Sequence, residues 1–275
     1  MLKTPVVSRL YQTCRKRYHT RQFIKAARNH VINLGEYQKA LVLEDGKVVD
    51  IQMRDGLVIA LRRNYMDAVI LAETFFERQY MRGFSFPEKP VVIDIGGFIG
   101  DSALFAAKHL NARKVIVCEP SPKNLELLRR NVARNHFEGQ IEIVDKAVTD
   151  GRKVFLNIDA ENRAQARVSA YDTSPVEKKA VPVITLADLM KEYAVEQVDL
   201  LKIDCEGGEY GIFASTSPEL LRQIRNIVFE YHEIEGYQDE LKSVIQKLSD
   251  AGFTVQTHGN LVYASLREKS GGRQN

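Results

Sequence analysis

The sequence is poor in cysteine and has no long apolar run, and both absences narrow its class. Three cysteines in 275 residues are widely spaced, and none lies in a C-x-x-C pair, so neither a disulfide framework nor a zinc site is indicated. No apolar run approaches the roughly 18–20 residues that a membrane span requires. The amino terminus is basic but lacks the apolar core of a secretory signal. We therefore expect a cytoplasmic protein.

Positive charge is concentrated in the first 40 residues. This segment contains nine Lys and Arg against one acid, Glu36, whereas the rest of the chain has a net charge of −5. We expect such a basic arm either to pack on the body as a solvated helix, or to contact a membrane surface or an anionic glycan carrier. The body has no basic stripe interleaved with aromatic residues, so nucleic acid is not an expected partner.

The amino-terminal third is expected to be an extension of mixed structure over residues 1–88. Apolar residues at broken helical spacing predict a helix over 1–37. Alternating residues over 41–62, with two Asp-Gly turns, predict a short antiparallel meander. A second helical pattern covers 65–81. The extension is therefore a basic helical arm, a β-meander and a helix.

From residue 90 onwards the pattern changes to a regular alternation of strands and helices. Short, fully apolar strands with helical crossovers predict an α/β domain with a doubly wound, mostly parallel sheet over residues 89–268. Residues 152–184 interrupt this alternation as an insertion with β-like pieces. A final pair of alternating runs within 253–265 predicts an antiparallel hairpin at the sheet edge. Residues 269–275 are expected to be a disordered tail. The expected strands of the domain are 91–93, 114–118, 141–144, 198–203 and 227–230.

A glycine-rich loop directly follows the first of these strands. Asp94 is followed by Gly96, Gly97 and Gly100, which let the backbone turn tightly and approach a ligand closely. Nicotinamide sites favour G-x-G-x-x-G and a pyrophosphate at the helix start, but here the spacing is D-x-G-x-x-x-G, with a carboxylate that repels phosphate. S-adenosylmethionine (SAM) has no phosphate and has an ammonium group. We expect Asp94 to bind that ammonium, directly or through a water.

A second acid ends the next strand. Glu119 stands where a carboxylate accepts hydrogen bonds from both hydroxyls of a ribose, which indicates a nucleoside in the crevice. The alternative is that Glu119 only begins a turn. Asp145, Lys146 and Ala147 follow the third strand, where the sheet borders the expected adenine, and their backbone groups are predicted to bind it.

The fourth strand ends in a cluster of acids. Asp204, Glu206 and Glu209 flank a Gly-Gly pair directly after residues 198–203, at the edge of the sheet where ligands bind in open α/β folds. We expect Asp204 to lie near the cofactor. Glu209 also fits a purely structural role in the first turn of a helix. A Mg²⁺ ion held by these acids is an alternative, although we expect no metal site.

The fifth strand ends near a histidine. Glu230 and His232 share a face at the end of residues 227–230, and both should point toward the crevice. A hydroxyl acceptor needs a general base, and histidine has the pKa that suits this role. His232 is therefore the leading candidate for the base and Asp204 its rival. A structural role for His232 is the alternative.

Three of these motifs together resemble the FkbM-type family of SAM-dependent methyltransferases. The most specific of them is residues 201–209, and the likeness covers roughly residues 65–235. The resemblance implies a Rossmann-like class I methyltransferase fold, SAM as cofactor, and O-methylation of a sugar or polyketide hydroxyl. Phe98 departs from the family, which commonly has a small or polar residue there. Gly208 replaces a common alanine.

We therefore expect a SAM-dependent methyltransferase that acts on a hydroxyl of a sugar, a glycan or a related small molecule. Two other readings stay open at this point: N-methylation of a small molecule or protein, and a non-catalytic SAM-binding protein. A dinucleotide reductase is disfavoured by the glycine spacing. The basic arm and the predicted meander lie outside the resemblance, so they say nothing about the acceptor.

Overall fold

The computed structural model describes residues 19–157, 168–169, 178–205, 207–231 and 239–267. The chain divides into two compact units, Met1–Gln79 and Tyr80–Asn275. Across the described ranges, no helix has both the length and the apolar character needed to cross a membrane.

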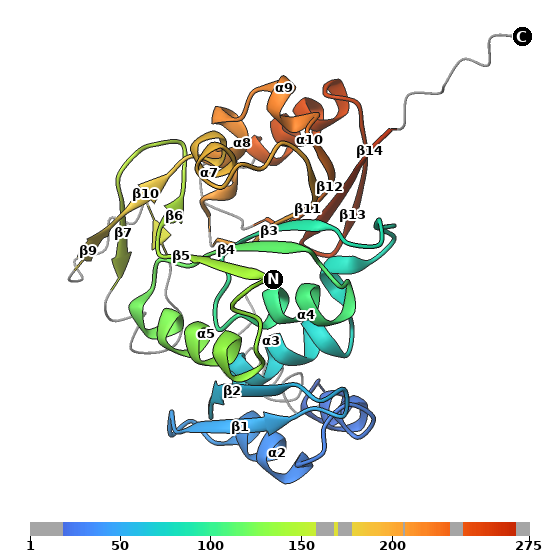
Figure 1. Cartoon of the computed structure of the whole chain (residues 1–275), viewed down its shortest axis with the longest axis vertical. Coiled ribbons are helices and arrows are strands. Elements are labelled where there is room, and N and C mark those ends of the chain that lie inside the picture. The colour runs from blue at the N-terminus through green and yellow to red at the C-terminus, as the bar shows by residue number, and fades with distance from the viewer. Residues whose placement is uncertain (1–18, 158–167, 170–177, 206, 232–238, 268–275) are drawn as a thin grey trace, which may run out of the picture. The chain divides into compact units, whose positions relative to one another are not determined.

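The N-terminal unit combines short helices with a two-stranded antiparallel hairpin (Figure 1). Its described elements are a helix at residues 19–27, α2 (Leu34–Val42), β1 (Val48–Gln52), β2 (Val58–Arg62) and α3 (Tyr65–Phe75). Tyr37 of α2 is fully buried, and its hydroxyl donates a hydrogen bond to the carbonyl of Ala68 in α3 at 2.9 Å. This bond ties the two helices together.

Two predictions for this unit need correction. The single helix expected over residues 1–37 is interrupted at 28–33, where the chain turns and Val31 forms an isolated bridge with Met53; residues 1–18 lie outside the described ranges. The first strand of the predicted meander, which begins at Leu41, is wrong because α2 continues to Val42. Leu41 is buried on the same face of α2 as Tyr37, so the helical spacing of apolar residues decides the structure here and the short alternation does not. The later hairpin, β1 and β2, is confirmed.

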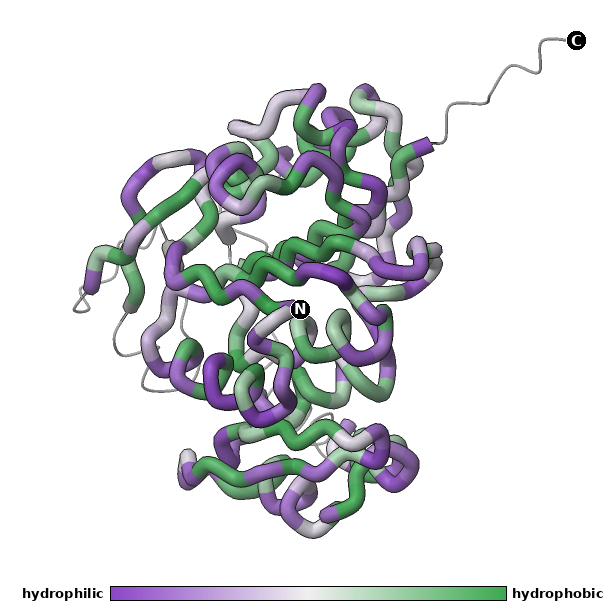
Figure 2. The backbone as a smooth tube through the Cα atoms, in the orientation of Figure 1, coloured by the Kyte–Doolittle hydropathy of each residue, from purple (hydrophilic) through white to green (hydrophobic). Residues whose placement is uncertain are grey.

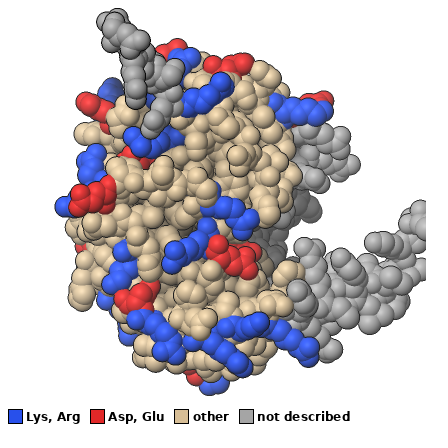
Figure 3. All heavy atoms as spheres, turned by 90° about the vertical axis from the view of Figure 1, so that its right-hand side faces the viewer, with Lys and Arg blue, Asp and Glu red and all other residues tan. Residues whose placement is uncertain are grey.

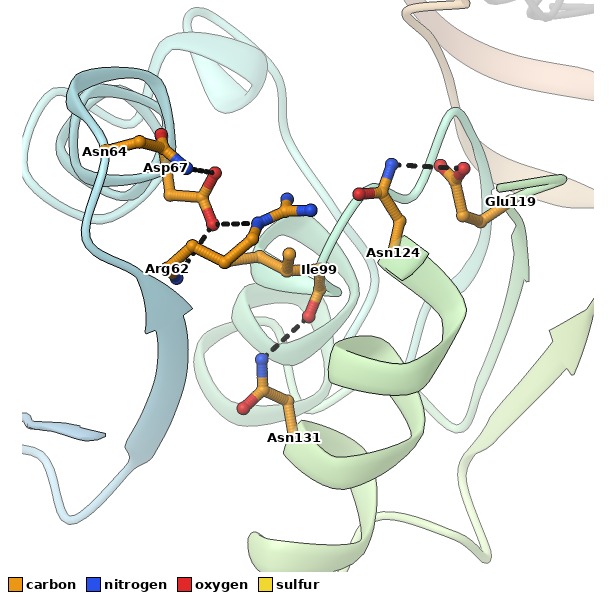
Figure 4. A network of polar contacts seen from close by, with 7 residues as sticks. All are labelled: Arg62, Asn64, Asp67, Ile99, Glu119, Asn124 and Asn131. Atoms are coloured by element: carbon orange, nitrogen blue, oxygen red, sulfur yellow. Dashed lines mark hydrogen bonds and ion pairs between the residues drawn. The ribbon is translucent and has the colours of Figure 1, made fainter. Parts of the chain in front are cut away.

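The start of α3 is fixed by a polar network within this unit (Figure 4). Asn64 caps the helix, and its side chain accepts a hydrogen bond from the backbone N–H of Asp67 at 2.7 Å. The buried Asp67 carboxylate also receives the Arg62 side chain, with Nε 2.9 Å away. The cap satisfies a helix N–H that would otherwise lack a partner, which explains why α3 begins here.

The second unit is built on a seven-stranded sheet with the order β13-β14-β12-β11-β3-β4-β5. The five strands from β12 to β5 are parallel, whereas β13 and β14 form an antiparallel hairpin at one edge. The central strands are mostly apolar (Figure 2); in β3 the exception is Asp94. The strands are β3 (Val91–Ile95), β4 (Lys114–Cys118), β5 (Ile141–Val144), β11 (Val198–Ile203), β12 (Ile224–Glu230), β13 (Phe253–His258) and β14 (Leu261–Leu266). The predicted doubly wound sheet with its closing hairpin is confirmed.

Helices cover both faces of this sheet (Figure 1). On one face lie α4 (Asp101–His109) and α5 (Pro122–Arg134). On the other lie α7 (Leu186–Glu192), α8 (Glu209–Ser215), α9 (Pro218–Leu221) and α10 (Glu240–Asp250). Because both faces are buried, the strands need no polar side and consist mainly of apolar residues, with buried charges at Asp94 in β3 and Lys202 in β11.

Short strands make up the insertion predicted between residues 152 and 184. An antiparallel group pairs β7 (Val154–Asn157) with β8 (Val168–Ser169) and β9 (Lys178–Val181). A parallel pair joins β6 (Ala147–Val148) to β10 (Val183–Ile184). Residues 158–167 and 170–177 of this insertion lie outside the described ranges, and so does the tail predicted at 269–275.

Candidate functional site

The strand order brings the predicted site residues to one edge of the sheet. β3 lies between β11 and β4, and all three are parallel, so their carboxyl ends meet at the same edge. The chain passes from β3 to β4 on one side and returns through β11 on the other, which makes β3 the switch point where open α/β sheets bind ligands. Asp94, the glycine loop, Glu119 and Asp204 all come from these three strands or directly follow them.

The glycine loop is held tightly between its neighbouring strands. Gly96 has a φ of +81°, and a Cβ there would lie 1.7 Å from the carbonyl oxygen of Asp204. At Gly97 a Cβ would lie 2.0 Å from Cγ2 of Val117. Gly100, with a φ of +89°, begins α4. Glycine is therefore required at the first two positions by space and at Gly96 also by backbone conformation.

The carboxylate of Asp94 forms an ion pair with a lysine of the same chain. Its side chain is 1% exposed, and Oδ1 lies 3.0 Å from Nζ of Lys202, which is also buried. The Ser102 hydroxyl in the first turn of α4 donates a hydrogen bond to the other carboxylate oxygen. That Asp94 binds the cofactor ammonium stays a prediction; the structure assigns its charge a partner in Lys202.

Lys202 also holds the glycine loop. Its ammonium donates a hydrogen bond to the carbonyl of Gly96 at 2.7 Å and lies 5.2 Å from the ring centre of Tyr80. Although burial alone would lower it, the pKa of Lys202 is raised above its ordinary value by the carboxylates of Asp94 and Asp204, among others. The lysine therefore stays charged beneath the loop.

Glu119 connects the end of β4 with the glycine loop and the start of α5. One of its carboxylate oxygens accepts from the backbone N–H of Phe98 at 2.9 Å, and the other from the N–H of Ser121 at 2.8 Å. Asn124, in the first turn of α5, adds a side-chain bond at 3.3 Å (Figure 4). Ser121 stands at the cap position before α5 and makes no capping bond from its own side chain. Burial raises the pKa of Glu119 to about 7, against the effect of these hydrogen bonds.

The backbone angle of Phe98 and a contact of the next residue also shape the loop. Phe98 is not a glycine but has a φ of +49°, in the left-handed region. The next residue, Ile99, is fully buried, and its carbonyl accepts a hydrogen bond from the Asn131 side chain of α5 at 2.8 Å (Figure 4). Phe98 is therefore held by its own N–H bond to Glu119 and by the anchored Ile99 after it, and such backbone outliers concentrate at ligand sites.

Asp204 lies beside this loop at the end of β11. Its backbone N–H donates to the carbonyl of Ile95 at 2.9 Å, and its side chain is partly exposed. The Tyr80 hydroxyl donates to Oδ2 of Asp204 at 3.0 Å. Glu209 lies in the first turn of α8, where it is buried and accepts from the backbone N–H of Cys205 at 3.3 Å, in keeping with its structural reading. Glu206 and His232 lie outside the described residues.

The segment expected at the adenine has other contacts in the structure. The N–H of Ala147 donates to the carbonyl of Pro182 at 2.9 Å, in the pairing of β6 with β10. Lys146 forms an ion pair with Glu192 at 3.0 Å, and Asp145 is largely exposed. The predicted adenine contacts of this segment stay predictions, and the N–H of Ala147 is already used.

Lys202 and Tyr80 were not predicted as site residues. A lysine inside a buried apolar strand is a usable signal, because a charge there requires an opposite charge nearby. The helix predicted over residues 65–81 would contain Tyr80, but α3 ends at Phe75 and Tyr80 lies in a separate 3₁₀ turn, Gln79–Met81. Within the described ranges, no group of three or more His, Cys, Asp or Glu is placed to hold a metal ion.

Comparison with known proteins gives a family match over this unit. A family model described as the methyltransferase FkbM domain matches residues 94–255, which is more than half of the chain. The chain is 27% identical over 222 residues to the 31-O-demethyl-FK506 methyltransferase FkbM of Streptomyces tacrolimicus, covering 70% of this chain and 84% of that protein. It is 23% identical over 198 residues to methyltransferase sdnD of Sordaria araneosa, covering 62% and 75%.

Among solved structures, the chain is similar to a crystal structure of methyltransferase FkbM from Methylobacillus flagellatus KT. The TM-score is 0.48 at 15% sequence identity. The match covers 70% of this chain and 47% of that chain, so this protein spans about half the length of the crystallised one.

Proposed function

Because the chain belongs to the FkbM methyltransferase family and uses S-adenosylmethionine as its methyl donor, we propose that it methylates a hydroxyl group of a small molecule, a sugar or a glycan. The family and the cofactor expected from the sequence are thereby confirmed. The acceptor and the roles of individual residues are the proposal.

The residues at the sheet edge fit the cofactor. The glycines at 96 and 97 let the loop pack directly against the backbone of Asp204 and the side chain of Val117, which keeps its backbone close to the strand ends where we propose that the cofactor binds. The Glu119 carboxylate, directly after β4, would accept from the ribose hydroxyls in addition to its protein donors, since each carboxylate oxygen has two lone pairs. Asp204, partly exposed beside the loop, supplies a negative charge for the cationic part of the molecule.

The observation that carries the choice of an oxygen acceptor is the relative from Streptomyces tacrolimicus. Its name places the transferred methyl group on an oxygen, and the alignment covers 84% of that protein. A hydroxyl acceptor is therefore the choice that this comparison supports best.

The chemistry requires alignment of the acceptor and removal of its proton. Bound SAM supplies an electrophilic methyl group. We assign the proton to His232, which follows β12 in the sequence by two residues, with Asp204 as the competing base. The protein residues would hold the two reactants in line, take the hydroxyl proton, and leave an ether and S-adenosylhomocysteine as products.

Cofactor binding gives the first test. Calorimetry should show that SAM and S-adenosylhomocysteine bind and that NADH does not. Glu119→Ala removes charge-assisted hydrogen bonds to the ribose and should weaken SAM binding by roughly 2–4 kcal/mol. NADH binding without SAM binding would refute the proposed function.

Acceptor chemistry gives the second test. The chain is incubated with SAM and panels of hydroxylated and aminated compounds, and release of S-adenosylhomocysteine is measured, with the new bond identified by NMR. Methylation of oxygen supports the proposal, whereas methylation confined to nitrogen refutes it. With an acceptor in hand, His232→Ala should slow transfer by on the order of 10²–10⁴ while SAM affinity is kept. If Asp204→Asn carries that loss instead, Asp204 is the base.

A further inference from the structure

Tyr80 is the first residue of the second unit and is almost completely buried. It lies in the 3₁₀ turn Gln79–Met81, and its side chain is 4% exposed. Its hydroxyl donates a hydrogen bond to Oδ2 of Asp204, 124 residues further along the chain, at 3.0 Å. A residue outside the β/α alternation thus contacts an acid at the proposed cofactor crevice.

The two carboxylates near this contact, Asp94 and Asp204, differ in whether they form an ion pair with Lys202. Lys202 forms its ion pair with Asp94 at 3.0 Å, and both side chains are buried. Nζ of Lys202 also lies over the face of the Tyr80 ring, 5.2 Å from the ring centre. Asp94 is therefore neutralised inside the protein.

Asp204 is the carboxylate left for a ligand. No lysine or arginine in the described part of the chain forms an ion pair with it, although the charge of Lys202 acts on it from a greater distance. Its backbone lies against the glycine loop, where a Cβ on Gly96 would be 1.7 Å from the Asp204 carbonyl oxygen. A partly exposed negative charge therefore borders the loop that approaches the cofactor.

We propose that Tyr80 is a positioning residue that orients the Asp204 carboxylate toward the sulfonium of SAM, while Lys202 serves as the internal counter-ion of Asp94. This inference rests on the proposed cofactor site and deepens it. SAM carries a sulfonium that S-adenosylhomocysteine lacks, whereas the ammonium is common to both. A carboxylate held at the sulfonium therefore favours the substrate form of the cofactor over its product, which helps the product leave.

The test compares the dissociation constants of SAM and S-adenosylhomocysteine, so it needs no acceptor. Tyr80→Phe removes the hydroxyl and keeps the ring over Lys202. It should weaken SAM binding roughly 3–10-fold, the usual effect of one hydrogen bond, and S-adenosylhomocysteine binding much less. Asp204→Asn should lower the preference for SAM by at least as much. Tyr37→Phe, which also removes a buried hydroxyl bond but lies in the other unit, is the matched control and should leave the preference unchanged.

A double variant separates positioning from general loosening of the fold. If the hydroxyl acts through the carboxylate, Tyr80→Phe should change the SAM preference in the wild-type background but not in the Asp204→Asn background. Equal effects in both backgrounds, or an unchanged preference in Tyr80→Phe, overturn the role of Tyr80. An unchanged preference in Asp204→Asn overturns the sulfonium contact. In each of these cases SAM still binds and the proposed function stands; a wild-type protein that binds no SAM refutes the proposed function itself.

Discussion

Glu119 joins a structural role to its proposed role at the ribose. Its carboxylate receives two backbone N–H groups, from Phe98 in the loop and from Ser121 before α5. The same group is 6% exposed, and burial raises its pKa to about 7. Loss of this side chain would therefore affect the shape of the loop as well as a direct contact, so Glu119→Ala should be read together with the stability of the variant.

The raised pKa of Glu119 predicts a pH-dependent stability of the protein without cofactor. Its ordinary value is 4.5, so between about pH 4.5 and 7 the folded state binds more protons than the unfolded state. The free energy of unfolding should accordingly fall as pH rises through this window, by roughly 3 kcal/mol from this group, and then level off.

Glu119→Gln is the variant that isolates this effect, because it keeps the size of the side chain and cannot ionise. It should be less stable than the wild type at low pH, since its amide group faces a backbone N–H donor. Urea unfolding at several pH values measures the difference between the two proteins. That difference should shrink as pH rises from 5 to 8, and a constant difference contradicts the raised pKa.

At the scale of elements, the glycine loop is limited by two different neighbours. A Cβ on Gly97 would clash with the side chain of Val117, at 2.0 Å, and would only touch the backbone of Cys118, whereas a Cβ on Gly96 would clash with the backbone of Asp204. The side chain of Val117 can be shortened by a second substitution. The backbone carbonyl of Asp204 is present whatever residue stands there, so no second substitution can remove it. The two glycines should therefore respond differently to rescue.

Gly97→Ala should destabilise the protein by about 1–3 kcal/mol through overpacking, and Val117→Ala should restore part of that loss. Gly96→Ala, which also has an unfavourable φ of +81°, should cost more and should not be rescued by Val117→Ala. Chemical denaturation of the single and double variants measures this. Gly139→Ala, with no atom within 4 Å of the added Cβ, is the control and should be nearly neutral. Strict additivity of the Gly97 and Val117 effects would contradict the packing argument.

The elements of the second unit could be predicted because the local sequence patterns agree with the burial and pairing of the strands in the fold. β3 is fully buried and apolar except for Asp94, and the alternation within residues 253–265 gives the antiparallel hairpin of β13 and β14. The ion pair of Asp94 with Lys202 was not predictable, because it depends on the register of β11 against β3. The position of Tyr80 depends on where α3 ends, and terminal residues of helices are the least certain part of a sequence-based prediction.

For the whole molecule, charge differs between the two units. Met1–Gln79 contains 14 Lys and Arg against 8 Asp and Glu, whereas Tyr80–Asn275 contains 25 against 28. On the face drawn in Figure 3, basic side chains are spread over the surface, with acidic side chains between many of them. The excess of positive charge in the sequence of the first unit is the basis for proposing that it contacts an anionic carrier or membrane surface.

This charge difference predicts selective binding to anionic vesicles. The full chain should sediment with vesicles containing phosphatidylserine and less with neutral ones, and added salt should weaken the association. A protein of residues 80–275 should bind neither kind. Equal binding of both proteins would show that the first unit does not provide the contact.

The division of the chain also predicts how far it can be shortened from the amino terminus. A start near residue 38 removes Tyr37, which is fully buried in the first unit, and should leave that unit poorly folded. A start at Tyr80 keeps the seven-stranded sheet and the described residues proposed for the cofactor site. A start at residue 89, the domain boundary expected from the sequence, keeps the sheet but loses the bond from Tyr80 to Asp204.

We therefore expect residues 80–275 to fold cooperatively and to bind SAM with the preference over S-adenosylhomocysteine of the full chain. Residues 89–275 should still bind S-adenosylhomocysteine but should lose part of the preference for SAM, as Tyr80→Phe does. Thermal unfolding and calorimetry on both proteins measure this. An 80–275 protein that does not fold would show that the first unit is required for the stability of the second, and equal cofactor preference in the two proteins would show that Tyr80 does not orient Asp204.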